Sequence, residues 1–78
     1  MKQLDIVQLM NKDDFIKAHV HLLSCGWEIK GFGSRSVLYK SKKDKLTIFS
    51  EGDQLLFKMN NEEAKELTED NLIRTILF

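Results

Sequence analysis

The spacing of apolar residues divides the chain into a helical start, an alternating middle and a helical end. From about Lys12 to Cys25, apolar side chains recur every three or four residues, which predicts an amphipathic helix. Asn11 can cap this helix, and Gly26 suits the left-handed conformation just past its end. The side chains that share its apolar arc of about 160° are Phe15, Ile16, His19, Val20, Leu22 and Leu23.

Shorter helical segments are predicted near the two ends of the chain. Residues 3–10 contain apolar positions without a continuous stripe, so a short helix or a turn is expected. Asn60 or Asn61 can cap a helical turn over 62–67, and Thr68 can cap a final helix. The residues expected on the buried face of that final helix are Leu72, Ile73, Ile76 and Leu77.

Between Trp27 and Met59 the apolar period shortens to two, which predicts β-strands. Turn residues interrupt the alternation at 31–34, 41–44 and 50–53. Connections this short join antiparallel neighbours, so the four strands are expected to form a meander. The side chains expected to face the helices are Trp27, Ile29, Val37, Tyr39, Leu46, Ile48, Leu55, Phe57 and Met59.

The pattern therefore predicts a single small α+β domain over 1–78, a two-layer sandwich. A four-stranded antiparallel meander would carry the N- and C-terminal helices on one face, and 78 residues leave no room for a second core. Leu38, Phe49 and Leu56 are then expected on the opposite face. Such a patch indicates a partner interface or a homodimer, although scattered surface hydrophobes are also common.

Charge is unevenly distributed along a chain whose formal net charge is zero. Residues 30–45 carry six basic side chains and one acidic one, a net charge of +5, whereas residues 51–70 carry −5. A basic segment can hold phosphates even in a neutral protein. Both segments are equally explained as solvated faces that keep the domain soluble.

Composition limits the classes of protein to which the chain can belong. Hydrophobic residues make up 42% and charged residues 31%, which is a globular composition. One cysteine and two histidines exclude an internal disulfide and a four-ligand zinc site. No apolar run reaches the roughly 20 residues needed to cross a bilayer, and Asp5 falls where a signal peptide would be apolar. We expect a soluble, cytoplasmic protein without a metal or cofactor.

No set of acid, base and nucleophile converges in the sequence, so the protein is not expected to be an enzyme. Cys25 ends a helix and is expected to be a small buried packing residue. His19 lies within the apolar arc, where a buried imidazole bonded to a backbone carbonyl is expected. The acidic residues between Glu62 and Asp70 fit an exposed helical face.

The remaining chemistry lies between residues 30 and 45. Two glycines let backbone amides turn toward an anion, while serine hydroxyls and cationic side chains complete a phosphate site. The leading hypothesis is a non-catalytic regulatory module that contacts RNA or DNA phosphates through this basic hairpin. Its candidate residues are Lys30, Gly33, Ser34, Arg35, Lys40, Lys42, Lys43 and Lys45.

The alternative is a small protein-binding regulator or inhibitor, of the kind that phages and mobile elements encode, acting on a host protein. It would use the apolar patch formed by Leu38, Phe49 and Leu56, or the acidic segment between Glu62 and Asp70. Overall neutrality favours a protein partner, whereas the clustering of lysines favours nucleic acid.

Several short motifs resemble the HicA toxin family, whose members are small double-stranded-RNA-binding-like domains that cleave messenger RNA. The matching segments are Leu22–Trp27, Gly33-Ser34, Tyr39-Lys40, Leu46–Ile48 and the last helix from Glu66 onward. The resemblance implies a two-layer fold over about 60 residues. Arg35 stands where the family has its catalytic histidine, so the resemblance does not imply ribonuclease activity.

Overall fold

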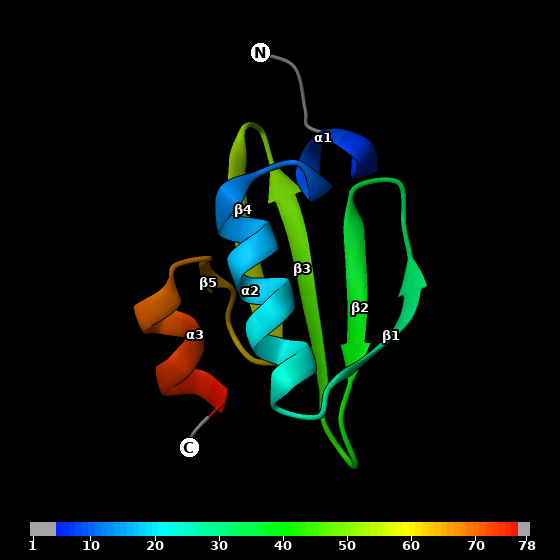
Figure 1. The fold of residues 1–78 in the computed structure, drawn as a ribbon. Helices are drawn as coiled ribbons and strands as arrows, with labels where there is room; N and C mark the ends of the chain where they lie inside the picture. Colours follow the sequence, from blue (N-terminus) through cyan, green and yellow to red (C-terminus); the bar gives the residue numbers. More distant parts are fainter. Residues whose placement is uncertain (1–4, 77–78) are drawn as a thin grey trace.

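The computed structural model describes residues 5–76 as a five-stranded sheet with three helices. The elements are α1 (Ile6–Met10), α2 (Asp13–Ser24), β1 (Glu28–Phe32), β2 (Ser36–Lys40), β3 (Lys45–Glu51), β4 (Gln54–Met59), β5 (Lys65–Glu66) and α3 (Glu69–Ile76). The strands pair in chain order and every pair is antiparallel. Helices α2 and α3 lie side by side on one face of the sheet, which confirms the predicted α+β class (Figure 1).

The predicted count of four strands is one short. Residues 62–67, expected to form a helical turn, contain β5, which pairs with Leu56 and Phe57 of β4. The amide of Leu67 then donates to the carbonyl oxygen of Leu55 at 3.0 Å, and the Leu67 side chain is buried. A two-residue strand is too short for alternation to mark it, and its acidic flank resembles the first turn of a helix.

Alternation along the strands identifies the face that packs against the helices. Every residue expected there is buried, except Ile29, which is half-buried. Strand β1 continues through Gly31 and Phe32, which were predicted as turn residues, and a bulge lies between Ile29 and Gly31. The bulge lets β1 accommodate one extra residue opposite β2 while Phe32 still pairs with Val37.

The two N-terminal helices meet at Asn11, which was predicted to cap α2. Asn11 instead ends α1, and Lys12 precedes α2 without a side-chain cap. The start of α1 has a capping box, in which the Asp5 carboxylate accepts from the Gln8 amide at 2.9 Å. Gly26 takes the predicted left-handed conformation after α2, with φ of +93°.

The buried face of α2 is rotated from its predicted position. Phe15, Ala18 and Leu22 are buried and His19 is half-buried. The other three apolar residues of the predicted arc are exposed, Ile16 to 45%, Val20 to 60% and Leu23 to 46%. The sheet covers only one side of α2, and α3 lies beside it, so the small Ala18 faces inward and half of the apolar arc faces outward.

The final helix begins where the sequence predicts. The Asn71 amide donates to the Thr68 hydroxyl at 3.1 Å, which caps α3. Leu72 is buried, and Ile73 and Ile76 are half-buried, whereas Leu77 lies outside the described residues. Within residues 5–76, no helix is long and apolar enough to cross a membrane.

Candidate nucleic-acid interface

The sheet has one face that α2 and α3 leave uncovered, and strand register determines which residues share it (Figure 1). Directly paired residues point to the same face, as do alternate residues along a strand. Four rows cross this outer face: Glu28–Lys40–Lys45, then Gly31–Leu38–Thr47–Lys58, then Ser36–Phe49–Leu56–Glu66, then Glu51–Gln54.

One end of the outer face is strongly basic. Lys40 and Lys45 pair directly across β2 and β3, and Lys42 and Lys43 lie in the turn that joins these strands. Lys58 occupies the adjacent row on β4. All five side chains are exposed. We call these five lysines the basic end of the sheet.

Two acidic side chains lie at the basic end: Glu28 pairs directly with Lys40 across β1 and β2, and Asp44 lies in the turn between Lys43 and Lys45. The Glu28 carboxylate forms an ion pair with Lys30, with 3.4 Å between Oε2 and Nζ. Within residues 5–76, none of the five lysines of the basic end forms an ion pair. Their charges are therefore available to an external anion.

The turn that carries Lys42 and Lys43 is held in place by Asn60, which follows β4. The Asn60 side-chain oxygen accepts from the Lys45 amide at 2.9 Å, and its Nδ2 donates to the Asp44 carboxylate at 3.1 Å. The Asn60 amide donates to the Lys45 carbonyl oxygen at 2.7 Å. Asn60 has φ of +55°, a left-handed conformation that asparagine tolerates well. This residue, predicted only as a possible helix cap, positions the lysine turn.

The structure does not bring Gly33, Ser34 and Arg35 into the basic end. They form the turn between β1 and β2, at the opposite end of β2 from Lys40. Five-residue strands span about 13 Å, so the two turns cannot hold one phosphate together.

The predicted use of the Gly33 backbone is wrong. Its amide donates to the Ser36 carbonyl oxygen at 2.8 Å, so it closes the hairpin and is not directed at an anion. A Cβ at Gly33 would lie 2.5 Å from the Ser36 hydroxyl oxygen, so the glycine permits a close approach within the turn.

The apolar patch predicted on the outer face lies where expected. Leu38, Phe49 and Leu56 are half-buried and occupy the two central rows between the basic end and Glu51. The strand register places all three side chains on the face of the sheet opposite to α2 and α3 (Figure 1).

The two histidines of α2 lie in different surroundings. His19 is half-buried, and its Nδ1 lies 2.7 Å from the Tyr39 hydroxyl, so its partner is a side chain and the predicted backbone carbonyl is not involved. Burial raises the pKa of Tyr39 above its ordinary value, which keeps the phenol neutral. The ring of Phe15 stacks on His19, with 5.7 Å between ring centroids.

Cys25 is exposed, which corrects the prediction of a buried packing residue. Its Sγ lies 3.8 Å from His21 Nε2, one helical turn earlier. No other side chain among the described residues forms a hydrogen bond with the His21 imidazole. A nucleophile and base pair needs a third group to orient the base, and this surface contact lacks one in the part of the chain that the structure describes.

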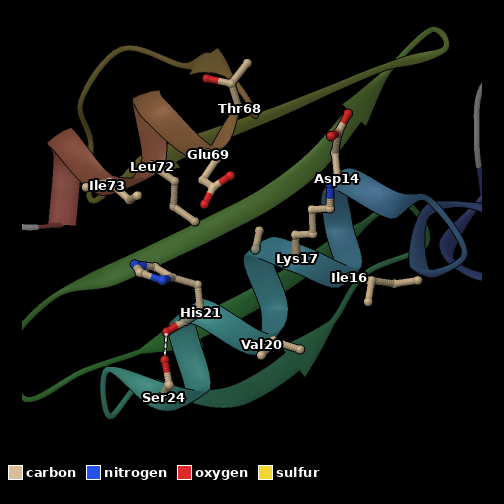
Figure 2. Close-up of a pocket in the computed structure, with 11 residues that line it drawn as sticks. Asp14, Ile16, Lys17, Val20, His21, Ser24, Thr68, Glu69, Leu72 and Ile73 are labelled. Atoms are coloured by element: carbon tan, nitrogen blue, oxygen red, sulfur yellow. Dashed lines mark hydrogen bonds between the residues drawn. The ribbon is translucent and has the colours of Figure 1, made fainter.

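A groove of about 530 Å³ runs between α2 and α3. Figure 2 shows Leu72 and Glu69 of α3, and His21 of α2, pointing into the space between the helices. The Ser24 hydroxyl donates to the His21 carbonyl oxygen at 2.7 Å, so it is directed at the backbone and not at the imidazole. Buried aliphatic side chains such as Leu72 and exposed polar ones such as Glu69 therefore both line the groove.

No protein-family model matches this sequence, and no curated protein or solved structure shows significant similarity to it. The resemblance to the HicA family stays a prediction.

Proposed function

We propose that this protein is a non-catalytic binding module that contacts the phosphates of RNA or DNA through the basic end of its sheet. The observation that carries the proposal is the gathering of five exposed lysines, without ion pairs in the described residues, at one end of the sheet whose outer face α2 and α3 leave open. Three of them lie on adjacent strands, and Lys42 and Lys43 extend from the turn beyond.

Lysine is suited to this role because its ammonium group is a point charge on a long stem that can follow a phosphate backbone. Phosphate contacts fix the position of a protein on a nucleic acid but carry little sequence information. The lysines of the basic end would therefore support binding that depends weakly on sequence and strongly on salt.

The salt dependence can be stated in advance. If four lysines neutralise phosphates of a duplex, the affinity should fall about 150-fold between about 50 and 200 mM salt. Fluorescence anisotropy with labelled RNA and DNA oligonucleotides, single-stranded and duplex, measures this slope. An affinity that does not change with salt would contradict the proposal.

Matched charge reversals separate the effect of the basic end on binding from the effect of the overall net charge. Lys42→Glu with Lys43→Glu should abolish most of the binding, because both charges leave the basic end. Lys12→Glu with Lys17→Glu makes the same change in net charge near the start of α2, and should retain binding. Equal losses in the two variants would refute a localised interface.

A second candidate function is favoured by the uncovered apolar patch of Leu38, Phe49 and Leu56. In this case the protein is a small regulator or inhibitor that binds a host protein through the outer face. Phe49→Asp should then eliminate a partner recovered from cell extract while the circular dichroism spectrum is retained. An unchanged set of partners would exclude this role for the patch.

A further inference from the structure

The outer face of the sheet is dipolar along the strand direction. Lys45 lies at one end of β3 and Glu51 at the other, with Thr47 and Phe49 between them on the same face. Both charged side chains are exposed. Six residues of strand separate the two charges by about 20 Å, so they cannot neutralise each other within one molecule.

On one side of β3, two strands together show the same polarity. Lys58 on β4 shares its row with Thr47, and Glu66 on β5 shares the next row with Phe49. Lys40 adds a third cation at the basic end, where it pairs with Glu28 of β1. The apolar patch lies between the two groups of charges, so cations, apolar side chains and anions follow one another along β3 and from β4 to β5.

We infer that this face binds a second copy of the same chain. A two-fold axis that lies between the two sheets and perpendicular to the strands reverses the strand direction of the second copy. Lys45 of each molecule then faces Glu51 of the other, and Lys58 lies beside Glu66 of the other. Both contacts occur twice, and Phe49 of each molecule faces Thr47 of the other, so the two apolar patches lie side by side at the centre.

Charge selects this arrangement among the face-to-face pairings. A two-fold axis parallel to the strands would place Lys45 against Lys45 and Glu51 against Glu51, which charge repulsion disfavours. The antiparallel arrangement replaces both repulsions with attractions. The charges of the outer face therefore attract in the antiparallel pairing and repel in the parallel pairing.

The size of the face limits the strength of the dimer. Strands of two to seven residues, spaced about 4.8 Å apart, give a footprint of roughly 400 Å² per copy, or about 800 Å² in total. This area lies below that of a standard specific interface, so a weak, reversible dimer is expected. Lys45 and Lys58 belong to both proposed surfaces, so nucleic acid would compete with dimerisation, and the dimer is therefore measured without nucleic acid present.

Charge reversal tests the geometry directly by sedimentation equilibrium of the full chain at about 10 µM to 1 mM, a range suited to a weak interface. Lys45→Glu and Glu51→Lys should each weaken dimerisation at least about ten-fold, because each turns two attractions into repulsions. The double variant carries both changes and should recover the wild-type dimerisation constant. Lys17→Glu, which changes the net charge on α2, is the matched control and should leave dimerisation unchanged.

Three results would overturn the inference. The wild-type chain could remain monomeric throughout the concentration range, which would indicate that the outer face binds a different protein. The double variant could remain as weak as the single variants, which would exclude the pairing of Lys45 with Glu51. Lys17→Glu could weaken dimerisation as much as Lys45→Glu, which would remove the role of the outer face.

A second charge pair keeps the test valid if one variant fails to fold. Lys58→Glu and Glu66→Lys should each weaken dimerisation, and the variant that combines them should recover it. Both side chains are exposed, so the fold should tolerate these changes. The fluorescence of the single, buried Trp27 reports whether each variant retains its core. A folded Lys58 and Glu66 series without loss and recovery would contradict the proposed arrangement. Because these measurements contain no nucleic acid, their failure leaves the proposed phosphate-binding function to be decided by its own experiment.

Discussion

The hydroxyl of Tyr39 lies 2.7 Å from Nδ1 of His19, which joins β2 to the middle of α2. Both groups belong to the layer between sheet and helix, where Tyr39 is fully buried and His19 is half-buried. A polar contact in this layer has a required geometry, unlike the aliphatic contacts around it. The pair therefore fixes the position of α2 along the sheet.

Removing the hydroxyl should destabilise the fold measurably. Tyr39→Phe leaves the imidazole without its partner, so the free energy of unfolding should fall by about 1–2 kcal/mol. Urea unfolding followed by Trp27 fluorescence measures the change. Adding His19→Phe to Tyr39→Phe removes both polar groups, and the cost of the double variant should be less than the sum of the single costs. Additive costs would show that the two side chains are not coupled.

The same tyrosine gives a prediction about alkaline pH. Burial raises the pKa of Tyr39 above the value of about 10 that an unfolded tyrosine has. The fold favours the neutral phenol, so this contribution to stability is complete below about pH 10 and is lost as the pH rises above it. As the chain has one tyrosine, phenolate absorbance should appear only when Trp27 fluorescence reports unfolding. Phenolate formation in the folded protein near pH 10 would contradict the prediction.

Adjacent leucines on α2 should respond differently to truncation. Leu22 is fully buried, so Leu22→Ala should lower the free energy of unfolding by about 2–5 kcal/mol. Leu23 is 46% exposed, so Leu23→Ala should cost about 1 kcal/mol or less. Thermal or urea unfolding of the two variants compares the same chemical change on two sides of one helix. Similar losses in the free energy of unfolding would contradict the burial of Leu22 and the exposure of Leu23 on α2.

Asn60 should stabilise the lysine turn through its side chain. Asn60→Gly preserves the left-handed backbone and removes the bonds to Asp44 and Lys45. Asn61→Gly is the matched control, since Asn61 is exposed and its side chain forms no hydrogen bond among the described residues. Asn60→Gly should cost about 1 kcal/mol more than Asn61→Gly. It should also speed hydrogen exchange of the Lys45 amide. Equal exchange rates in both variants would show that the Asn60 side chain does not stabilise the turn.

The two turns at opposite ends of β2 should differ in their contribution to nucleic-acid binding. Lys43→Ala removes a cation from the basic end and should weaken binding about three-fold or more at low salt, with a shallower salt slope. Arg35→Ala removes a cation from the turn between β1 and β2, and should change the affinity by less than about two-fold. Anisotropy titrations of the two variants measure both losses of affinity. A larger loss for Arg35→Ala would show that the interface lies at the other end of the sheet.

Four of the five strands could be predicted from the sequence because their signal is local. Alternation from Trp27 to Met59, interrupted by short turns, marks both the strands and the face that packs against the helices. The position of Leu38, Phe49 and Leu56 on the other face follows from the same period. Neighbouring strands joined by short turns must be antiparallel, so the topology also follows.

Features that depend on residues far apart in the chain could not be predicted in the same way. The hydrogen bond from the Lys45 amide to the Asn60 side chain joins residues 15 positions apart, and nothing near Asn60 in the sequence indicates it. The separation of Arg35 from the lysines follows from the length of β2, which the charge pattern alone ignores. On α2 the apolar arc is wider than the surface that covers it, so periodicity could not decide which half is buried.

The order of the strands has a consequence for how the chain folds. Each strand pairs only with strands adjacent to it in the sequence, so every hairpin closes a short loop and loses little chain entropy. Assembly can advance from one hairpin to the next without waiting for distant segments to meet. Proteins with such local connectivity fold quickly for their β content, which shortens the time that unpaired edges are open to aggregation.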